Sequence, residues 1–168
     1  MRIYNIVPVL FLAAVMTSCS TNSATVEYDG GKVRVTAVSE NIIRVEAVPG
    51  GAEFSTAESL SIVQRKGGCK PEIRREDGET VISTGRVTAR VDAATGQVRF
   101  FDALGKPVAG EYRREFSPIE VEGTKGWTVR QIFDSSEDEG FYGLGQHQAD
   151  EWNYKGRNEE LYQYNTKI

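Results

Sequence analysis

Short runs of alternating apolar and polar residues constrain this chain more than any other feature of its sequence. Val33, Val35 and Ala37 are separated by single residues, and the stretch from Arg86 to Asp92 repeats the pattern. A period of two turns one face of a strand toward a core, whereas no stretch after Cys19 has the period of an amphipathic helix. Such runs recur about every 8–12 residues with turn residues between them, which is typical of an antiparallel β-sandwich. We therefore predict an all-β fold.

The same pattern divides the chain into expected strands and expected loops. Strands are expected at residues 33–38, 42–48, 60–63, 80–84, 86–92, 97–101 and 126–133. An exposed charged turn is expected at 72–79, and irregular charged segments are expected at 111–118 and 134–140. Glycines at the ends of several runs permit the positive φ angles that tight turns require.

Met1 to Cys19 is predicted to be a processed leader. Arg2 gives it a positive start, and its apolar core is shorter than the about 20 residues that span a bilayer. Small residues precede Cys19, which resembles a bacterial lipobox, where the cysteine is acylated and becomes the mature N-terminus. We predict a lipoprotein signal peptide over 1–18, a tether over 19–24 and a β-sandwich domain over 25–168, anchored in the membrane at the periplasmic or outer-membrane face. The alternative is an ordinary cleaved secretory peptide.

Charge and cysteine content exclude several classes of protein. Acylation of Cys19 would leave Cys69 as the one remaining cysteine, so no disulfide framework is expected. A formal net charge of -4 argues against a nucleic-acid partner, which would require a basic surface. The acidic run Glu137–Glu139 is typical of a solvated loop rather than a metal site, and we expect neither metal nor cofactor.

Aromatic, amide and glycine residues gather between Phe141 and Thr166. This stretch contains Tyr142, Trp152, Tyr154, Tyr162 and Tyr164, three glycines and the only histidine, His147. A sugar-binding surface needs flat apolar faces beside fixed donors and acceptors, and these residue types supply both. The alternative is a glycine-rich turn followed by an edge strand with packed aromatic side chains.

Three motifs in this stretch carry a resemblance to a known family. The motifs are F-Y-G-L-G-Q-H-Q at 141–148, W-N-Y-K-G-R at 152–157 and L-Y-Q-Y-N-T at 161–166. Together they resemble the close of the N-terminal, galactose mutarotase-like β-sandwich domain of glycoside hydrolase family 31, in its α-xylosidase-like branch. The resemblance implies a retaining α-glycosidase whose two catalytic aspartates lie in a following (β/α)₈ barrel. A barrel takes about 250 residues, so we assign no catalytic residue here and expect this chain alone to be inactive.

The resemblance also implies which residues line the rim of the sugar pocket. The candidates are Gln146, His147, Gln148, Trp152 and Tyr154. Amides can both donate and accept hydrogen bonds to hydroxyl groups. His147 could instead bond its own loop. Trp152 and Tyr154 are two residues apart, a spacing that fits two interpretations: both line one face of a strand, or, more commonly, the pair is packing. The family usually carries Glu at the position of Gln146, so an ionic contact there is lost.

Two functions remain from different classes. The favoured one is the non-catalytic N-terminal domain of an α-glycosidase that acts on α-linked oligosaccharides, with α-xylosides favoured by the resemblance. The alternative is a free-standing carbohydrate-binding lipoprotein, which needs no catalytic pair. A third possibility is a structural remnant without activity, and it predicts poor solubility because an uncovered apolar face drives association.

Overall fold

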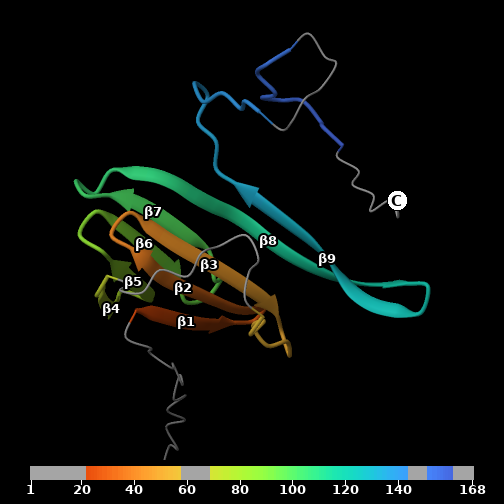
Figure 1. Ribbon diagram of the computed structural model, residues 1–168, viewed down its shortest axis with the longest axis horizontal. Coiled ribbons are helices and arrows are strands. Elements are labelled where there is room, and N and C mark those ends of the chain that lie inside the picture. Colours follow the sequence, from red (N-terminus) through yellow and green to blue (C-terminus); the bar gives the residue numbers. More distant parts are fainter. Residues whose placement is uncertain (1–21, 58–68, 144–150, 161–168) are drawn as a thin grey trace, which may run out of the picture. The chain divides into compact units, whose positions relative to one another are not determined.

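The computed structural model describes residues 22–57, 69–143 and 151–160, and all nine strands of this part of the chain are antiparallel (Figure 1). The chain divides into two compact units, 1–133 and 134–168. No helix of the described residues is long and apolar enough to cross a bilayer. The prediction of an all-β antiparallel sandwich is confirmed. The expected leader with Cys19, and the expected strand at 60–63, lie outside the described residues.

The first unit contains two sheets, one small and one large. The small sheet has the order β1-β2-β3 and the large one the order β4-β5-β6-β7-β8-β9, so within each sheet every strand pairs with its neighbours in sequence. The small sheet comprises β1 Ser23–Tyr28, β2 Gly31–Ser39 and β3 Ile42–Pro49. The large sheet comprises β4 Glu72–Glu76, β5 Glu79–Ser83, β6 Val87–Asp92, β7 Val98–Asp102, β8 Pro107–Val121 and β9 Thr124–Phe133.

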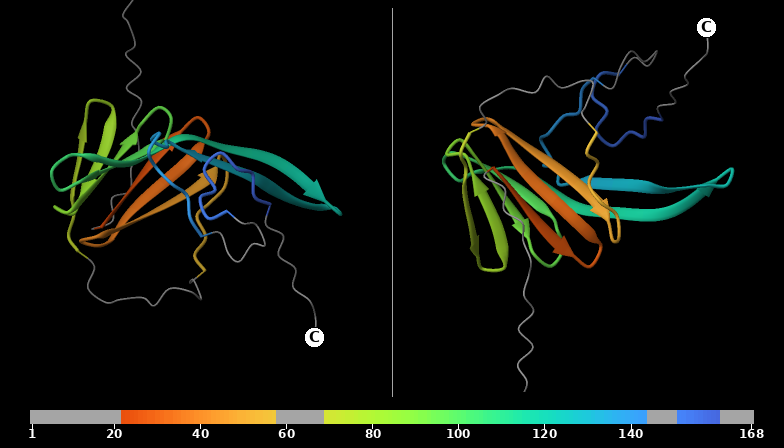
Figure 2. Two further views of the ribbon diagram at one scale, coloured as in Figure 1. Left: turned by 90° about the horizontal axis from the view of Figure 1, so that it is seen from above. Right: turned by 60° about the horizontal axis from the view of Figure 1, so that its bottom comes forward.

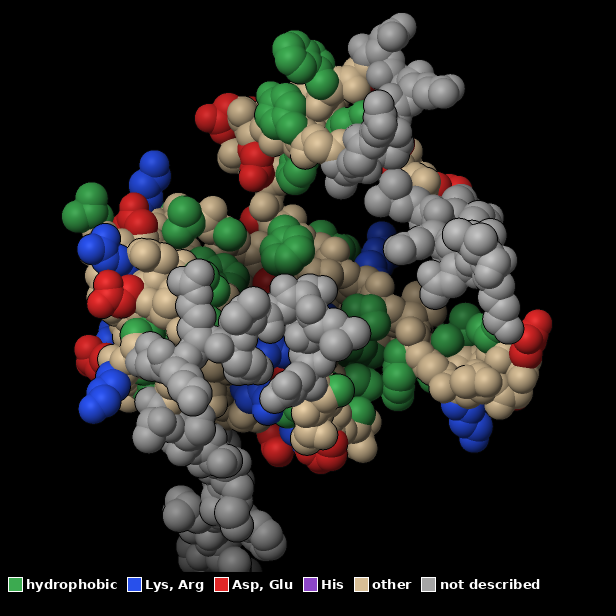
Figure 3. All heavy atoms as spheres, in the orientation of Figure 1, with side chains coloured by type: hydrophobic (Ala, Val, Ile, Leu, Met, Phe, Trp, Pro, Cys, Tyr) green, Lys and Arg blue, Asp and Glu red, His purple; other side chains and the backbone are tan. Residues whose placement is uncertain are grey.

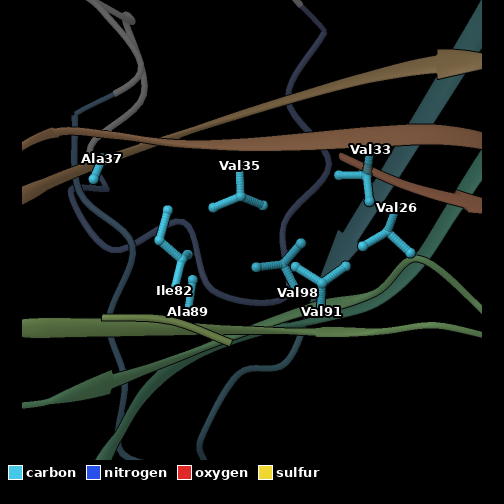
Figure 4. Packing of buried hydrophobic residues seen from close by; sticks show 8 residues of the cluster. All are labelled: Val26, Val33, Val35, Ala37, Ile82, Ala89, Val91 and Val98. Atoms are coloured by element: carbon cyan, nitrogen blue, oxygen red, sulfur yellow. The ribbon is translucent and has the colours of Figure 1, made fainter. Parts of the chain in front are cut away.

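The core lies between these two sheets, where the alternating residues of both meet (Figure 4). Val33, Val35 and Ala37 of β2 are fully buried, as their alternation predicted. They face buried side chains of the large sheet, namely Ile82, Ala89, Val91 and Val98. Burying each Val or Ile contributes about 1.5–3 kcal/mol, so this layer supplies most of the apolar stabilisation of the sandwich.

Asp92 fixes the turn between β6 and β7. One oxygen of its carboxylate accepts hydrogen bonds from the N–H of Ala94 at 3.0 Å, the N–H of Thr95 at 2.8 Å and the hydroxyl of Thr95 at 2.8 Å. The Thr95 hydroxyl and backbone N–H stabilise the ionised form and lower the pKa of Asp92 below its ordinary value. Gly96 closes the turn with φ +68°, as the sequence predicted for a turn at 93–96.

Two segments expected to be irregular are strands. Residues 72–79 contain β4 and the start of β5 around a tight turn at Asp77 and Gly78, and only the position of that turn was predicted correctly. β4 was not predicted because most of its residues are charged. It is the edge strand of the large sheet, where ion pairs such as Arg74–Glu76 at 3.0 Å replace apolar packing. The first strand likewise begins at Ser23, inside the segment expected to be a tether.

The segment 111–118 is the middle of β8, the longest strand. The ladder to β9 shifts register between Glu111 and Arg113, so Tyr112 is an extra residue and forms a β-bulge. Residues three apart normally point to opposite faces of a strand, but the bulge turns Glu111 and Arg114 to the same side. Their side chains are each 6% exposed and form an ion pair at 2.5 Å. Two of the four charges that suggested a loop, those of Glu111 and Arg114, are therefore buried inside a bulged strand.

This ion pair joins four parts of the large sheet. Glu111 also accepts the N–H of Val98 at 2.9 Å. The Arg114 guanidinium donates to Gln131 Oε1 at 3.0 Å and to the carbonyl of Gly96 at 3.3 Å. The β6–β7 turn, β7, β8 and β9 thus share one hydrogen-bonded network at the root of the β8–β9 hairpin, which reaches beyond the small sheet (Figure 2).

Candidate functional site

The candidate site lies in the second unit, whose described residues are 134–143 and 151–160. These residues form loops and turns without a regular strand. Asn153 links the two described segments, because its Oδ1 accepts the N–H of Phe141 at 3.0 Å and the N–H of Lys155 at 3.1 Å. The N–H of Tyr154 donates to the carbonyl of Phe141 at 2.8 Å. The Phe141 end of the first motif is therefore fixed against the W-N-Y-K motif.

Lys155 organises the acidic segment that precedes the motif. Its ammonium group donates to the carbonyls of Ser136 and Glu137, the latter at 2.8 Å. The hydroxyl of Ser136 lowers the pKa of Asp138, and the charge of Lys155 adds to the effect. The side chains of the acidic run are exposed, as expected for a solvated loop. No group of three or more potential metal ligands occurs among the described residues.

Trp152 and Tyr154 lie outside any strand of the described residues and differ in burial, so the interpretation that places both on one strand face is wrong. Trp152 is 84% exposed and lies in a bend, whereas Tyr154 is 8% exposed. A turn follows at once, closed by the N–H of Arg157 on the carbonyl of Tyr154 at 2.9 Å and by Gly156 with φ +73°. Because the chain turns here instead of continuing as a strand, the two-residue spacing does not place both side chains on one face. Tyr154 packs inward, while Trp152 presents its ring to solvent.

The described part of the site offers aromatic surface rather than paired acids. Besides Trp152, Phe141 is 44% and Tyr142 is 68% exposed. Glu151 is bound to the guanidinium of Arg157 at 2.5 Å. Exposed rings can stack on the apolar face of a sugar, and such contacts need no charge change. The other predicted rim residues, Gln146, His147 and Gln148, lie outside the described residues.

Sequence reasoning missed the two residues that fix this segment, Asn153 and Lys155. The signal for Asn153 was present, because an Asn side chain that bonds the N–H two residues later is a common turn device. Lys155 gave no comparable signal, since its partners are backbone carbonyls at 136 and 137 and any residue type presents a carbonyl.

The described residues form an all-β sandwich and a motif segment, in which exposed aromatic rings lie on a backbone held by the hydrogen bonds of Asn153. The sequence profile of the glycosyl hydrolase 31 N-terminal galactose mutarotase-like domain matches residues 32–167. This chain therefore belongs to that family of domains, which confirms the family suggested by the motifs.

Solved structures agree with this assignment. A family 31 α-xylosidase from Xanthomonas citri is 39% identical with a TM-score of 0.79, and the match covers 87% of this chain and 16% of that protein. An α-xylosidase from a soil metagenome, solved with xylose, is 25% identical with a TM-score of 0.71, over 84% of this chain and 24% of that protein. A Flavobacterium johnsoniae family 31 dextranase, solved with isomaltotriose, shares the fold at 22% identity and a TM-score of 0.64, over 85% of this chain and 17% of that one. The chain thus spans a quarter or less of the length of these relatives.

Proposed function

We propose that this chain serves as the non-catalytic N-terminal domain of a retaining α-glycosidase with α-xylosidase-type specificity. The observation that carries the proposal is the 39% identity to the Xanthomonas citri α-xylosidase over 87% of this chain. In this role the sandwich supports a catalytic barrel, and the segment 141–160 contributes to the rim of the sugar pocket. The barrel supplies the two carboxylates that act as nucleophile and as acid/base.

Trp152 is the described residue best suited to contact sugar. Its ring is 84% exposed, and the hydrogen bonds of Asn153 hold the backbone beside it. A ring on a fixed backbone loses little conformational entropy on binding, which favours a stacking contact. Tyr154 differs from Trp152 because its side chain is buried and supports the turn.

A fusion protein tests both the domain's role and the contact. This chain replaces the matched N-terminal part of the Xanthomonas citri α-xylosidase, and hydrolysis of p-nitrophenyl α-xyloside and of longer α-xylosyl oligosaccharides is measured. We expect activity. We expect Trp152→Ala to raise KM about 3- to 10-fold, which corresponds to an aromatic contact of about 0.5–1.5 kcal/mol.

Trp127→Ala is the matched control, because Trp127 is also exposed, at 47%, but belongs to β9 of the other unit. Its KM should remain that of the parent fusion. Equal effects of the two substitutions would count against a sugar contact at Trp152. An inactive but folded fusion, together with millimolar binding of xylosyl oligosaccharides to the chain alone by calorimetry, would favour the free-standing carbohydrate-binding protein instead.

We also propose that acylated Cys19 tethers the protein to a membrane, at the periplasmic or outer-membrane face. The support is the sequence of the leader, with a short apolar core followed by small residues and Cys19. In a Gram-negative host, the full chain should incorporate labelled palmitate and sediment with membranes. Cys19→Ser should lose both properties, while Cys69→Ser should keep them. Labelling that survives Cys19→Ser would refute the anchor.

A further inference from the structure

An open hollow of about 450 Å³ lies on the outer face of the large sheet. Val98 and Phe100 of β7 pack in the core. Arg99 and Phe101 alternate with them and therefore line the opposite face, where the hollow lies. The β7–β8 turn borders it, and a Cβ added at Gly105 in that turn would meet no atom within 4 Å, so the mouth is open there. The volume falls in the range of about 300–1,000 Å³ that small-molecule sites occupy.

Three arginines form a row across the strands at this hollow. In the register, Arg74 of β4 is opposite Val81 of β5, and Val81 is opposite Arg90 of β6. Arg90 is in turn opposite Arg99 of β7. Val81 is fully buried although it points away from the core, because the long side chains of its two arginine neighbours cover it. These arginine side chains therefore lie along the sheet.

Glutamates hold the three guanidinium groups in place. Arg74 Nε donates to Glu76 at 3.0 Å. Arg90 Nη1 donates to Glu79 at 3.2 Å, and Arg99 Nη2 pairs with the same carboxylate. Among the described residues, these bonds leave Nε and Nη2 of Arg90, and Nε and Nη1 of Arg99, without an acceptor. The row thus offers fixed N–H groups with spare donor capacity.

Hydroxyl groups, an aromatic ring and a carboxylate lie beside the row. Ser83 and Thr88 are opposite each other, and their hydroxyl oxygens are 3.0 Å apart. Phe101 is the next residue across from Thr88, and the guanidinium carbon of Arg90 lies 5.6 Å from its ring centroid. One oxygen of Asp102 accepts two backbone N–H groups of the β7–β8 turn at 2.9 Å, and in the described structure the other oxygen has no donor. The hollow therefore also supplies an acceptor and an apolar surface.

The charges around the hollow balance, which decides the class of ligand. The three arginines are matched by the three glutamates that pair with them, namely Glu72, Glu76 and Glu79. Asp102 adds one negative charge to the lining. Acidic and basic side chains are likewise interspersed at the left end of the first unit in the space-filling view (Figure 3). A phosphate or carboxylate would find no excess of positive charge, whereas a neutral sugar needs only fixed donors and acceptors beside an apolar face.

We infer that this hollow binds a neutral oligosaccharide. The spare N–H groups of Arg90 and Arg99 donate to sugar hydroxyls, the second oxygen of Asp102 accepts from them, and the ring of Phe101 contacts a C–H face. The site belongs to the first unit and shares no residue with the segment 141–160. The class of sugar rests on the proposed function, since an α-glycosidase that acts on oligosaccharides would gain a second hold on its substrate.

Titration of the full ¹⁵N-labelled chain with a neutral xyloglucan heptasaccharide, followed by NMR, tests this inference. The backbone amide signals of Thr88, Arg99 and Phe101 should shift with a common saturation curve. Arg99→Ala should weaken binding about tenfold, because it removes charge-assisted hydrogen bonds. Arg99→Lys keeps the charge beside Glu79 but loses the guanidinium fork, so it should also weaken binding if the alanine variant does not fold.

Arg44→Ala is the matched control on the small sheet. The side chains of Arg44 and Arg99 are 47% and 55% exposed, and each pairs with a glutamate, but only Arg99 lines the hollow. Arg44→Ala should leave the dissociation constant unchanged. Equal weakening by Arg44→Ala and Arg99→Ala would overturn the inference.

Two further outcomes would also overturn it. The first is that sodium sulfate, at the concentration of the sugar, shifts the same signals while the heptasaccharide does not, which would mean an anion site. The second is that the sugar shifts only signals of the segment 141–160. Hydrolysis of p-nitrophenyl α-xyloside by the fusion tests the proposed function separately. An active fusion whose hollow does not respond to sugar would refute this site and leave the proposed function intact, while an inactive fusion with a responding hollow would do the reverse.

Discussion

Replacing Arg114 with alanine is expected to lower the free energy of unfolding by about 3–5 kcal/mol, the usual cost of removing one partner of a buried ion pair. The Glu111 carboxylate would stay buried with its negative charge, because its side chain is only 6% exposed. Of its described hydrogen bonds, only the one from the N–H of Val98 would remain. The carbonyl of Gly96 and the Oε1 of Gln131 would also lose their donor.

Arg113→Ala provides the control for this prediction in the neighbouring residue. Arg113 pairs with Glu115 at 3.2 Å, but the two side chains are 50% and 40% exposed. An exposed pair contributes about 0–1 kcal/mol, so Arg113→Ala should be nearly neutral. Urea denaturation of the full chain, followed by circular dichroism and tryptophan fluorescence, measures both variants. Similar midpoints for the two variants would mean that the network at the root of the β8–β9 hairpin does not stabilise the fold.

The sequence predicted those strands whose inward faces carry the core. β2, β3 and β6 follow their alternation closely, because burial on one side selects apolar residues at every second position. β8 was missed because its middle is rich in charged residues: Glu111 and Arg114 are buried as an ion pair through the bulge at Tyr112, and Arg113 and Glu115 pair on the exposed side of the strand. A bulge changes which residues share a face, and nothing in a single sequence marks it.

The candidate site was predicted less completely than the fold. Trp152 is exposed and its role at the rim stays a prediction, while the interpretation that placed it on one strand face with Tyr154 failed because the motif turns where alternation assumed an extended chain. The frame around Asn153 depends on a contact between residues twelve apart in sequence, and such non-local contacts are invisible to periodicity. The residue types indicated an aromatic-rich segment, and the turn decides which of its side chains faces solvent.

Gly96→Ala is expected to destabilise the protein by about 2–5 kcal/mol, through backbone strain and overpacking together. Gly96 has φ +68°, a conformation that costs other residues about 1–2 kcal/mol. An added Cβ would also overlap the ring of Tyr28, whose hydroxyl oxygen is buried without a hydrogen-bond partner in the described structure. Tyr28 cannot swing aside freely, because its other edge lies against Gly30. The ring therefore ties β1 of the small sheet to the β6–β7 turn of the large one.

Gly105→Ala separates the two contributions, since Gly105 has φ +79° but no atom within 4 Å of an added Cβ. Gly105→Ala should lower the free energy of unfolding only through backbone strain, by about 1–2 kcal/mol. The difference between the two alanine variants in urea denaturation then measures the overlap with Tyr28. Adding Tyr28→Ala to Gly96→Ala should cost less than the sum of the single substitutions, because the clash is removed with the ring. Additive costs would mean that the ring does not rest on Gly96, and that the two sheets are held together by the valine core alone.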